Sequence, residues 1–346
     1  MSWFSHTAHP VQTEVEAFWY LNLTPEQQLA HDKLLEHLKE TRTLHQGHDD
    51  RFTLLRFLKA RQWDVHRAAA MYQSMVKWRI EQRTDHVYET FTFPEREAVL
   101  RHYPHFYHKT DKYGRPVYVE LLGQTDASKI LEATTLERLM HYHVCDWENL
   151  QRKILPACSV LAGRPIITKS VILDLKGVTL KNFGSAAQKM LRNVVTIDQD
   201  YYCESLGQMF IVNTPTVFRM IWAMVNPLLE ERTRRKIVIL GSDFLPTVTQ
   251  LVPLESLPAC LGGKSQEPAS LQDVGPWLDV QLPNPVKNPH KEKAAGADGQ
   301  EGGDCDPEQQ QAAVAVKATT AAVVSPPSSM RQSATAPGRL HLEEDE

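Results

Sequence analysis

A basic run follows an apolar segment in the last third of the chain. The segment VFRMIWAMVNPLL (217–229) is apolar nearly all round, and the run after it is Arg232, Thr233, Arg234, Arg235 and Lys236. Arginine and lysine beside a threonine hydroxyl can hold a phosphodiester. A helix without a polar face is buried or faces lipid, and this one is shorter than the about 20 apolar residues that span a bilayer. Two interpretations stay open: a core helix beside a solvated strand entrance, or a movable lid over an apolar cavity with a phosphate-sized cationic site at its end.

A second pattern resembles a phosphate loop. The segment PACLGGKS (258–265) approaches the motif G-x-x-x-x-G-K-[ST], but Pro258 takes the place of the first glycine. No strand–loop–helix context surrounds it, so a nucleotide site is not expected.

Histidine and cysteine cluster at two places where metal ligands could be sought: His102, His105 and His108, then His141, His143 and Cys145. A spacing of three on a strand places neighbours on opposite faces, and in a helix only the outer pair of the second group shares a face. We expect packing roles and no metal.

Sequence patterns of a catalytic centre are missing. Neither G-x-G-x-x-G nor G-x-S-x-G occurs, which leaves dinucleotide binding and an α/β-hydrolase unsupported. A nucleophile–base constellation is not visible either. We expect a non-enzymatic protein without a cofactor.

The composition is typical of a soluble globular protein, with 42% hydrophobic and 23% charged residues. The formal net charge of −4 arises after residue 286, because residues 1–286 carry equal numbers of basic and acidic side chains. Bulk charge therefore does not support a nucleic-acid partner. Five scattered cysteines without a C-x-x-C pair indicate a reducing compartment. With no secretory signal or transmembrane run visible, we expect a cytoplasmic protein whose membrane contact is peripheral.

The first part of the chain is predicted to be helical. Residues 1–23 form an N-terminal extension with an aromatic cluster at 18–20 that we expect to pack on the body. Residues 24–93 carry three amphipathic helices. The first begins at Thr24 with Gln27 in a capping box, and the others begin near Asp50 and Asp64. These helices predict a small all-α unit.

Residues 94–283 have an α/β pattern. A hairpin is predicted at 105–122, and a long helix from Thr134, paired with Glu137 in a capping box, to Leu155 before Pro156. Strands at 170–175, 209–212 and 236–240 then alternate with helices at 183–198 and 216–229, which predicts a mostly parallel sheet. Residues 284–346 lack aromatic side chains and are expected to be a disordered tail.

Seven segments in collinear order resemble the CRAL-TRIO lipid-binding family, closest to the fungal and plant phosphatidylinositol/phosphatidylcholine transfer proteins. They are RFTLLRFLKARQWDVHRA (51–68), HFYHKTDKYGRPVYVE (105–120), LPACS (155–159), VILDLKG (171–177), YYCESLGQMFIVNTPTVF (201–218), RRKIVILG (234–241) and LPACLGGK (257–264). The resemblance implies a helical N-terminal unit and a lipid-binding domain with an apolar cavity. It also implies a gating helix at 216–229, in which we assign the gate to Phe218, Ile221, Trp222 and Val225.

The resemblance further implies that Arg61, Glu204, Thr233 and Lys236 bind the head group of phosphatidylinositol. Thr233 and Lys236 suit the phosphate, and Glu204 can accept hydrogen bonds from inositol hydroxyls, while Arg61 balances charge. The family pattern has Lys or Arg after this arginine. Gln62 stands there in this chain, so we expect somewhat weaker phosphoinositide binding.

The predicted site for a choline lipid departs from the family pattern. The family holds this lipid with tyrosines and with a Ser-x-Thr on the strand before LDLKG. Tyr107 and Tyr118 are retained, but the strand positions are Lys169 and Val171. We hypothesise that a cavity-facing ammonium weakens phosphatidylcholine binding, or that an anionic or sterol-like lipid replaces it. In the alternative, Lys169 points outward into solvent and changes little.

The function implied by the resemblance is phosphatidylinositol transfer. The protein would exchange phospholipids between membranes, touch the membrane surface transiently and present phosphatidylinositol to a lipid kinase. We expect a monomer with bound phosphatidylinositol, located in the cytoplasm and peripherally on Golgi or endosomal membranes. Two alternatives stay open: a carrier of a sterol or other non-phospholipid ligand, and a lipid-sensing regulator or scaffold.

Overall fold

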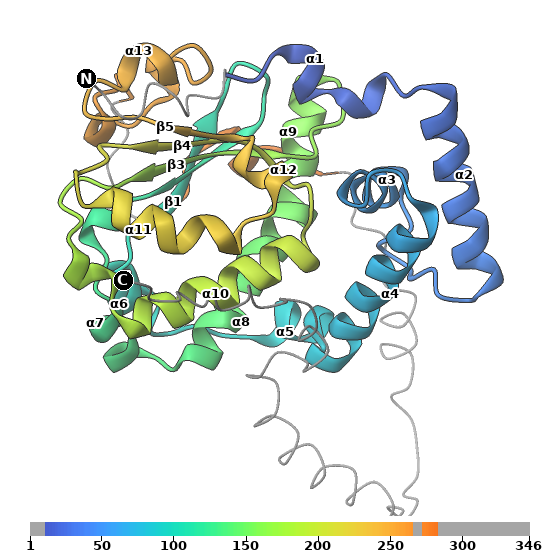
Figure 1. Cartoon of the computed structure of the whole chain (residues 1–346), viewed down its shortest axis with the longest axis horizontal. Helices are drawn as coiled ribbons and strands as arrows, with labels where there is room; N and C mark the ends of the chain where they lie inside the picture. The colour runs from blue at the N-terminus through green and yellow to red at the C-terminus, as the bar shows by residue number, and fades with distance from the viewer. Residues whose placement is uncertain (1–10, 266–271, 283–346) are drawn as a thin grey trace, which may run out of the picture. The chain divides into compact units, whose positions relative to one another are not determined.

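A five-stranded sheet forms the centre of the fold (Figure 1). The computed structural model describes residues 11–265 and 272–282. The strands are adjacent in chain order; the first pair is antiparallel and each later pair is parallel. They span His105–Thr110 (β1), Pro116–Glu120 (β2), Lys169–Asp174 (β3), Leu206–Val212 (β4) and Ile237–Ile239 (β5). The predicted mostly parallel α/β sheet is confirmed.

The β1–β2 hairpin is fixed by a buried aspartate in its turn. Oδ1 of Asp111 accepts hydrogen bonds from the backbone N–H groups of Tyr113 and Arg115, and Oδ2 accepts from Nε of Arg115 at 2.7 Å. The hydroxyl of Ser170 on β3 also donates to this carboxylate, at 2.7 Å. Because a buried charge is costly unless it is paired and hydrogen-bonded, these contacts hold the hairpin in register beside the parallel strands.

The N-terminal helices begin at the predicted caps. Thr24 caps α2 (Pro25–Glu40) in a capping box with Gln27, and Asp50 and Asp64 cap α3 (Arg51–Ala60) and α4 (Val65–Gln82). The predicted aromatic packing is also present, since the hydroxyl of Tyr20 donates to the carbonyl of Pro165 at 2.7 Å. Three short helices complete this part: α1 (Glu14–Ala17), α5 (Thr84–Thr90) and α6 (Arg96–Leu100).

A buried ion pair joins α4 to α8 (Leu136–Asn149). The two guanidinium nitrogens of Arg79 donate to the carboxylate of Glu148 at 2.8 and 3.0 Å. The hydroxyl of Tyr202 donates to the same carboxylate at 2.7 Å. The described residues up to 282 thus belong to one compact unit, and a domain boundary at residue 93 stays a prediction.

The remaining helices follow the prediction with two corrections. The cap of α8 is Thr135, which accepts from the Arg138 N–H, whereas Thr134 ends α7 (Ala127–Ala133). The helical run also passes Pro156 instead of stopping before it, because a π-helical turn at Leu150–Ile154 widens the backbone ahead of α9 (Leu155–Ala162). The later helices are α10 (Ser185–Asp200), α11 (Phe218–Val225), α12 (Glu231–Arg234) and α13 (Leu245–Val248).

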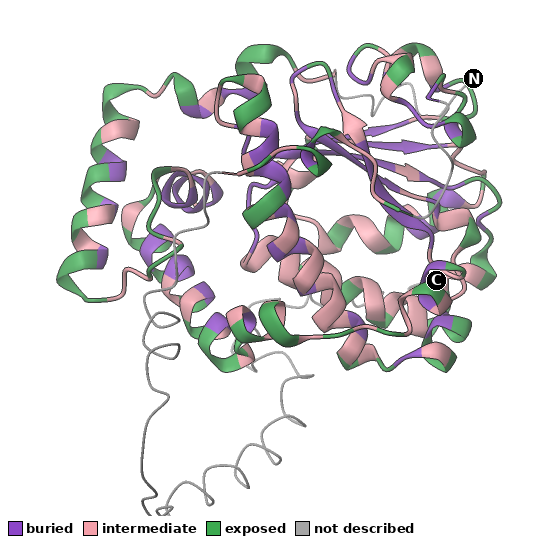
Figure 2. Cartoon of the chain, turned by 180° about the vertical axis from the view of Figure 1, so that it is seen from behind, coloured by how far each residue is buried: buried purple, intermediate pink, exposed green. Residues whose placement is uncertain are grey.

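The helices α8, α10 and α11 lie on one side of the sheet (Figure 1), while the strands themselves are largely buried (Figure 2). Within the described ranges, no helix is long and apolar enough to cross a membrane. The predicted disordered tail at 284–346 lies outside the described residues.

The glycines of PACLGGKS serve close packing. Gly262 has a φ of +79°, in the left-handed region that favours glycine. A Cβ on Gly263 would lie 1.9 Å from the carbonyl oxygen of Leu257. The left-handed φ of Gly262 and the close approach of the backbone at Gly263 therefore explain the glycine pair.

Candidate functional site

A cavity of about 360 Å³ lies between the sheet and the helices α8, α10 and α11, within the range of small-molecule sites. Its walls are mostly apolar. Three apolar residues of α10 line the cavity: Met190, Leu191 and Val194. No residue of α10 is fully buried by protein atoms. The apolar face of α10 is therefore turned toward a space that a hydrophobic ligand would fill.

Helix α11 has two apolar faces with different surroundings. The four predicted gate residues all line the cavity: Phe218, Ile221, Trp222 and Val225. Met220 and Met224 are 53% and 44% exposed. The nearly continuous apolar pattern thus arises because one side of the helix faces the cavity and the other faces solvent. The helix begins two residues later than predicted and is followed by a 3₁₀ turn at Asn226–Leu228.

Three cations converge on Glu204 at one end of the cavity. Nζ of Lys236 donates to its carboxylate at 2.9 Å, and the side chains of Lys59 and Arg232 lie 3.8 and 3.5 Å from it. The Glu204 side chain is 2% exposed. Burial opposes its ionisation, but Lys236, Lys59 and Arg232 outweigh burial and lower the pKa of Glu204. The carboxylate is therefore ionised and holds the cations together.

The structure brings three of the four predicted head-group residues to the cavity and leaves the fourth outside it. Glu204, Thr233 and Lys236 line the cavity, whereas Arg61 lies outside its lining. Nη1 of Arg61 is 3.6 Å from the carboxylate of Glu230, which also pairs with Arg232. Arg61 is thus linked to the others through a second glutamate.

Sequence reasoning missed two members of this cluster, Lys59 and Glu230, and placed Arg232 in the basic run without assigning it to the head group. Arg232 is the first residue of the basic run, and Lys59 lies two residues before Arg61. The sequence positions of both could therefore have indicated a role beside the predicted head-group residues. Burial lowers the pKa of Lys59 to about 7, against the opposing effect of Glu204. Glu204 itself has a φ of +56°, a strained backbone conformation of the kind that clusters at functional sites.

The second predicted set lies close to Glu204, because Lys169 at the start of β3 pairs with Leu206 and donates its backbone N–H to the carbonyl of Ser205. Tyr118, Lys169 and Val171 line the cavity, while Tyr107 is fully buried behind Tyr118, with ring centroids 4.8 Å apart. Lys169 is only 7% exposed. The alternative that its ammonium points outward into solvent is therefore wrong.

Half-buried carboxylates and a histidine line the cavity together with this set, and sequence reasoning missed their role. Glu120, Asp146 and Asp198 line the cavity together with His143. Nε2 of His143 lies 2.7 Å from Oδ1 of Asp198. Burial opposes charge on His143, but Asp198 outweighs it and raises the pKa of His143. In the part of the chain that the structure describes, no group of three or more His, Cys, Asp or Glu side chains could hold a metal ion.

Comparison with known proteins agrees with this geometry. Residues 100–263 match the CRAL/TRIO domain and residues 30–74 match the CRAL/TRIO N-terminal domain. The chain is 42% identical over 237 residues to the Sec14 cytosolic factor of Schizosaccharomyces pombe, covering 68% of this chain and 82% of that protein. The chain belongs to the CRAL/TRIO family.

Further relatives of this CRAL/TRIO protein come from Arabidopsis thaliana. Phosphatidylinositol/phosphatidylcholine transfer protein SFH7 is 40% identical, with 70% of this chain and 45% of that protein covered. For SFH11 the identity is 34%, and the coverage is 77% of this chain and 75% of the relative. The chain therefore spans about half the length of several curated relatives that it matches.

A solved structure confirms the fold of this CRAL/TRIO protein. The crystal structure of Sfh5 superimposes with a TM-score of 0.55 at 19% identity, covering 71% of this chain and 89% of the other. This likeness establishes the fold.

Proposed function

We propose that this CRAL/TRIO protein transfers phosphatidylinositol between membranes and performs no chemistry on it. The main observation behind this proposal is that Glu204, Thr233 and Lys236 lie together in the lining of an apolar cavity. Relatives named phosphatidylinositol/phosphatidylcholine transfer proteins support the proposal.

The charged end of the cavity suits an inositol phosphate. Lys236 and Arg232 supply charge to the phosphate, and Thr233 supplies a hydroxyl. Nη1 of Arg232 is buried and finds no hydrogen-bond partner within the described residues, so a donor is available for an anionic ligand. Glu204, held ionised by its cations, accepts hydrogen bonds from the inositol hydroxyls. Arg61 supports this set through Glu230.

The apolar wall suits the acyl chains. Burying each CH₂ group of a lipid tail away from water contributes about 0.8 kcal/mol. The transfer of a tail from a bilayer into the protein therefore costs no free energy only if the cavity is as apolar as the bilayer interior. Phe218, Ile221, Trp222 and Val225 close this wall from α11. We propose that α11 is the gate, and that Met220 and Met224 on its exposed face contact the membrane when it opens.

The cellular role follows from this exchange. We propose a cytoplasmic monomer that binds Golgi or endosomal membranes peripherally and presents phosphatidylinositol to a lipid kinase. A lipid-sensing scaffold would bind lipid without catalysing exchange. A sterol carrier would exchange lipid without depending on Lys236.

A vesicle-to-vesicle transfer assay tests the proposal. We expect the wild-type protein to move labelled phosphatidylinositol and the variant Lys236→Ala to lose at least about tenfold of that rate, in line with a charge-assisted contact. The exposed neighbour Arg235 provides the matched control Arg235→Ala, which should keep the wild-type rate. No phosphatidylinositol transfer by the wild type, or equal transfer by both variants, would overturn the proposal.

A further inference from the structure

A cation of the protein occupies an aromatic enclosure in the wall of the cavity. Nζ of Lys169 lies 4.1 Å from the ring centroid of Trp147, 4.3 Å from that of Tyr118 and 5.7 Å from that of Tyr107. All four residues are buried. Aromatic faces attract cations, and aromatic cages bind quaternary ammonium ligands. The enclosure has the composition of an ammonium site, and the ammonium in it is that of Lys169.

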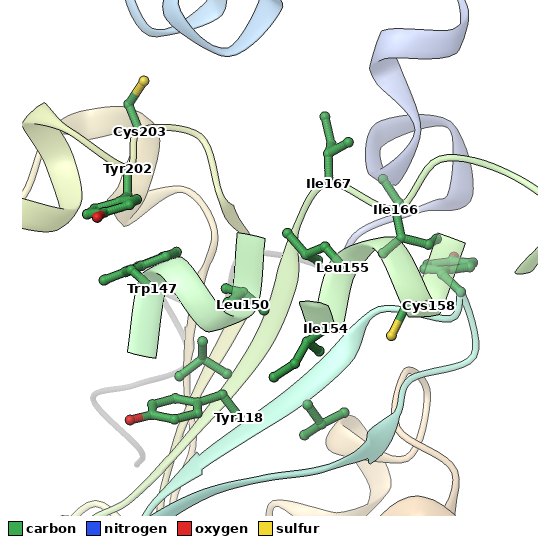
Figure 3. Packing of buried hydrophobic residues seen from close by; sticks show 14 of the residues in the cluster. Tyr118, Trp147, Leu150, Ile154, Leu155, Cys158, Ile166, Ile167, Tyr202 and Cys203 are labelled. Carbon is green, nitrogen blue, oxygen red and sulfur yellow. The ribbon is translucent and has the colours of Figure 1, made fainter. Parts of the chain in front are cut away.

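The rings of this enclosure are held in place by their own contacts. Nε1 of Trp147 donates to Oδ1 of Asp198 at 2.7 Å, and its ring stacks on that of Tyr202 with centroids 5.0 Å apart. Figure 3 shows Trp147 between Tyr202 and Tyr118. The hydroxyl of Tyr107 donates to Asp146 at 3.3 Å. The site is therefore built before any ligand arrives.

The charges around Lys169 do not favour an anion. Carboxylates line the cavity on three elements, with Glu120 on β2, Asp146 on α8 and Asp198 on α10. Lys169 and His143 are the cations beside these carboxylates, while Arg232 and Lys236, which also line the cavity, pair with Glu204. Burial raises the pKa of Glu120 to about 7 and raises that of Asp146, and it lowers the pKa of Lys169. A phosphate would face carboxylates without a surplus of positive charge.

We propose that the cavity beside Lys169 binds a lipid whose polar end is an uncharged hydroxyl, and that Lys169 excludes choline lipids by occupying the aromatic enclosure. The inference rests on the proposed function, because it names the second ligand class of the same cavity. A choline group would have to displace the ammonium of Lys169 and would place two cations together. A hydroxyl can instead accept a hydrogen bond from Lys169 and donate one to a carboxylate. Val171 adds an apolar wall beside it.

Lipid uptake from defined vesicles tests this inference. The purified protein is incubated with vesicles containing phosphatidylinositol, phosphatidylcholine, and either cholesterol or dioleoylglycerol, then re-isolated, and its lipids are quantified by mass spectrometry. The two neutral lipids separate a sterol from a glycerolipid as the source of the hydroxyl. We expect wild-type protein to take up phosphatidylinositol and one neutral lipid, with phosphatidylcholine at least about tenfold lower.

Two variants remove the internal cation. Lys169→Ser vacates the enclosure, and Lys169→Met removes the charge while keeping a long side chain in the cavity wall. Both should raise the ratio of phosphatidylcholine to phosphatidylinositol taken up by at least about tenfold. Exposed Lys176, which follows the same strand, supplies the matched control Lys176→Ser.

The outcomes separate the two proposals. Phosphatidylcholine uptake by wild-type protein equal to that of phosphatidylinositol overturns the inference and leaves the proposed function intact. Uptake of neither cholesterol nor dioleoylglycerol, or no gain of phosphatidylcholine in either Lys169 variant, also overturns it. Absence of phosphatidylinositol from the wild-type protein overturns the proposed function instead.

Discussion

The ammonium of Lys236 donates to the carboxylate of Glu204 across 2.9 Å, at the end of an apolar cavity. Lys59 and Arg232 approach the same carboxylate from α3 and α12. One buried anion thus gathers three basic side chains at the place where we propose that the phosphate binds. Glu204 stabilises these cations by its charge, and a bound phosphate would share them.

The first prediction concerns this anion. Replacing Glu204 by glutamine leaves three cations close together without their counter-charge, so we expect Glu204→Gln to lower the free energy of unfolding by about 1–3 kcal/mol. Chemical denaturation measures the change. Glu255, an exposed residue 4.0 Å from Lys264, provides the control Glu255→Gln, which should cost less than about 0.5 kcal/mol. Equal effects of the two changes would contradict the assigned role of Glu204.

The second prediction concerns pH. The pKa of Glu120 is raised by burial from 4.5 to about 7, so the native protein binds this proton more tightly than the unfolded chain. The favourable contribution of Glu120 to the free energy of unfolding is fully present below pH 4.5, and it is lost as the pH rises to about 7. We expect Glu120→Gln to be more stable than wild type by about 1–3 kcal/mol at pH 8 and to lose that advantage at pH 4.5. Denaturation at both pH values measures it, and a pH-independent difference would count against it.

The third prediction concerns the exposed face of α11. We expect the double change Met220→Glu and Met224→Glu to weaken vesicle binding by at least about tenfold, because two side chains lose their apolar burial in the membrane. Vesicle co-sedimentation measures binding. Leu29 and Ile80 are 54% and 64% exposed on α2 and α4, and their change to glutamate is the control. Equal loss in both double variants would show that α11 is not the docking face.

The fourth prediction concerns Gly263. A methyl group there would meet the Leu257 carbonyl oxygen at 1.9 Å, so Gly263→Ala should destabilise the fold by about 1–3 kcal/mol. At Gly241 nothing lies within 4 Å of an added Cβ, so Gly241→Ala should be close to neutral. Thermal unfolding compares them. Unchanged stability of Gly263→Ala would refute the packing explanation of this glycine pair.

The elements could be predicted because their signals are local. The caps at Thr24, Asp50 and Asp64 and the β-branched strands lie within a few residues of what they determine. The passage of the helix through Pro156 could not be predicted, since a π-helical turn has no clear sequence signal. The apolar pattern of 217–229 was ambiguous because it reports burial without saying whether protein or cavity lies behind the helix.

The candidate site was only partly predictable, for a related reason. Thr233 and Lys236 belong to one short run, but the contacts of Glu204 with Lys59 and of Trp147 with Asp198 join distant segments. Long-range contacts of this kind depend on the folded arrangement alone. The position of Lys169 within three aromatic rings likewise required the structure, although its departure from the family pattern was visible in the sequence.

The central claim is most directly tested by native mass spectrometry after incubation with vesicles that contain phosphatidylinositol. We predict one phosphatidylinositol molecule per chain in wild-type protein and in Arg235→Ala, and little or none in Lys236→Ala. A wild-type chain that emerges without phosphatidylinositol, or a Lys236→Ala chain that carries it fully, would contradict the assignment of Glu204, Thr233 and Lys236 as the head-group site.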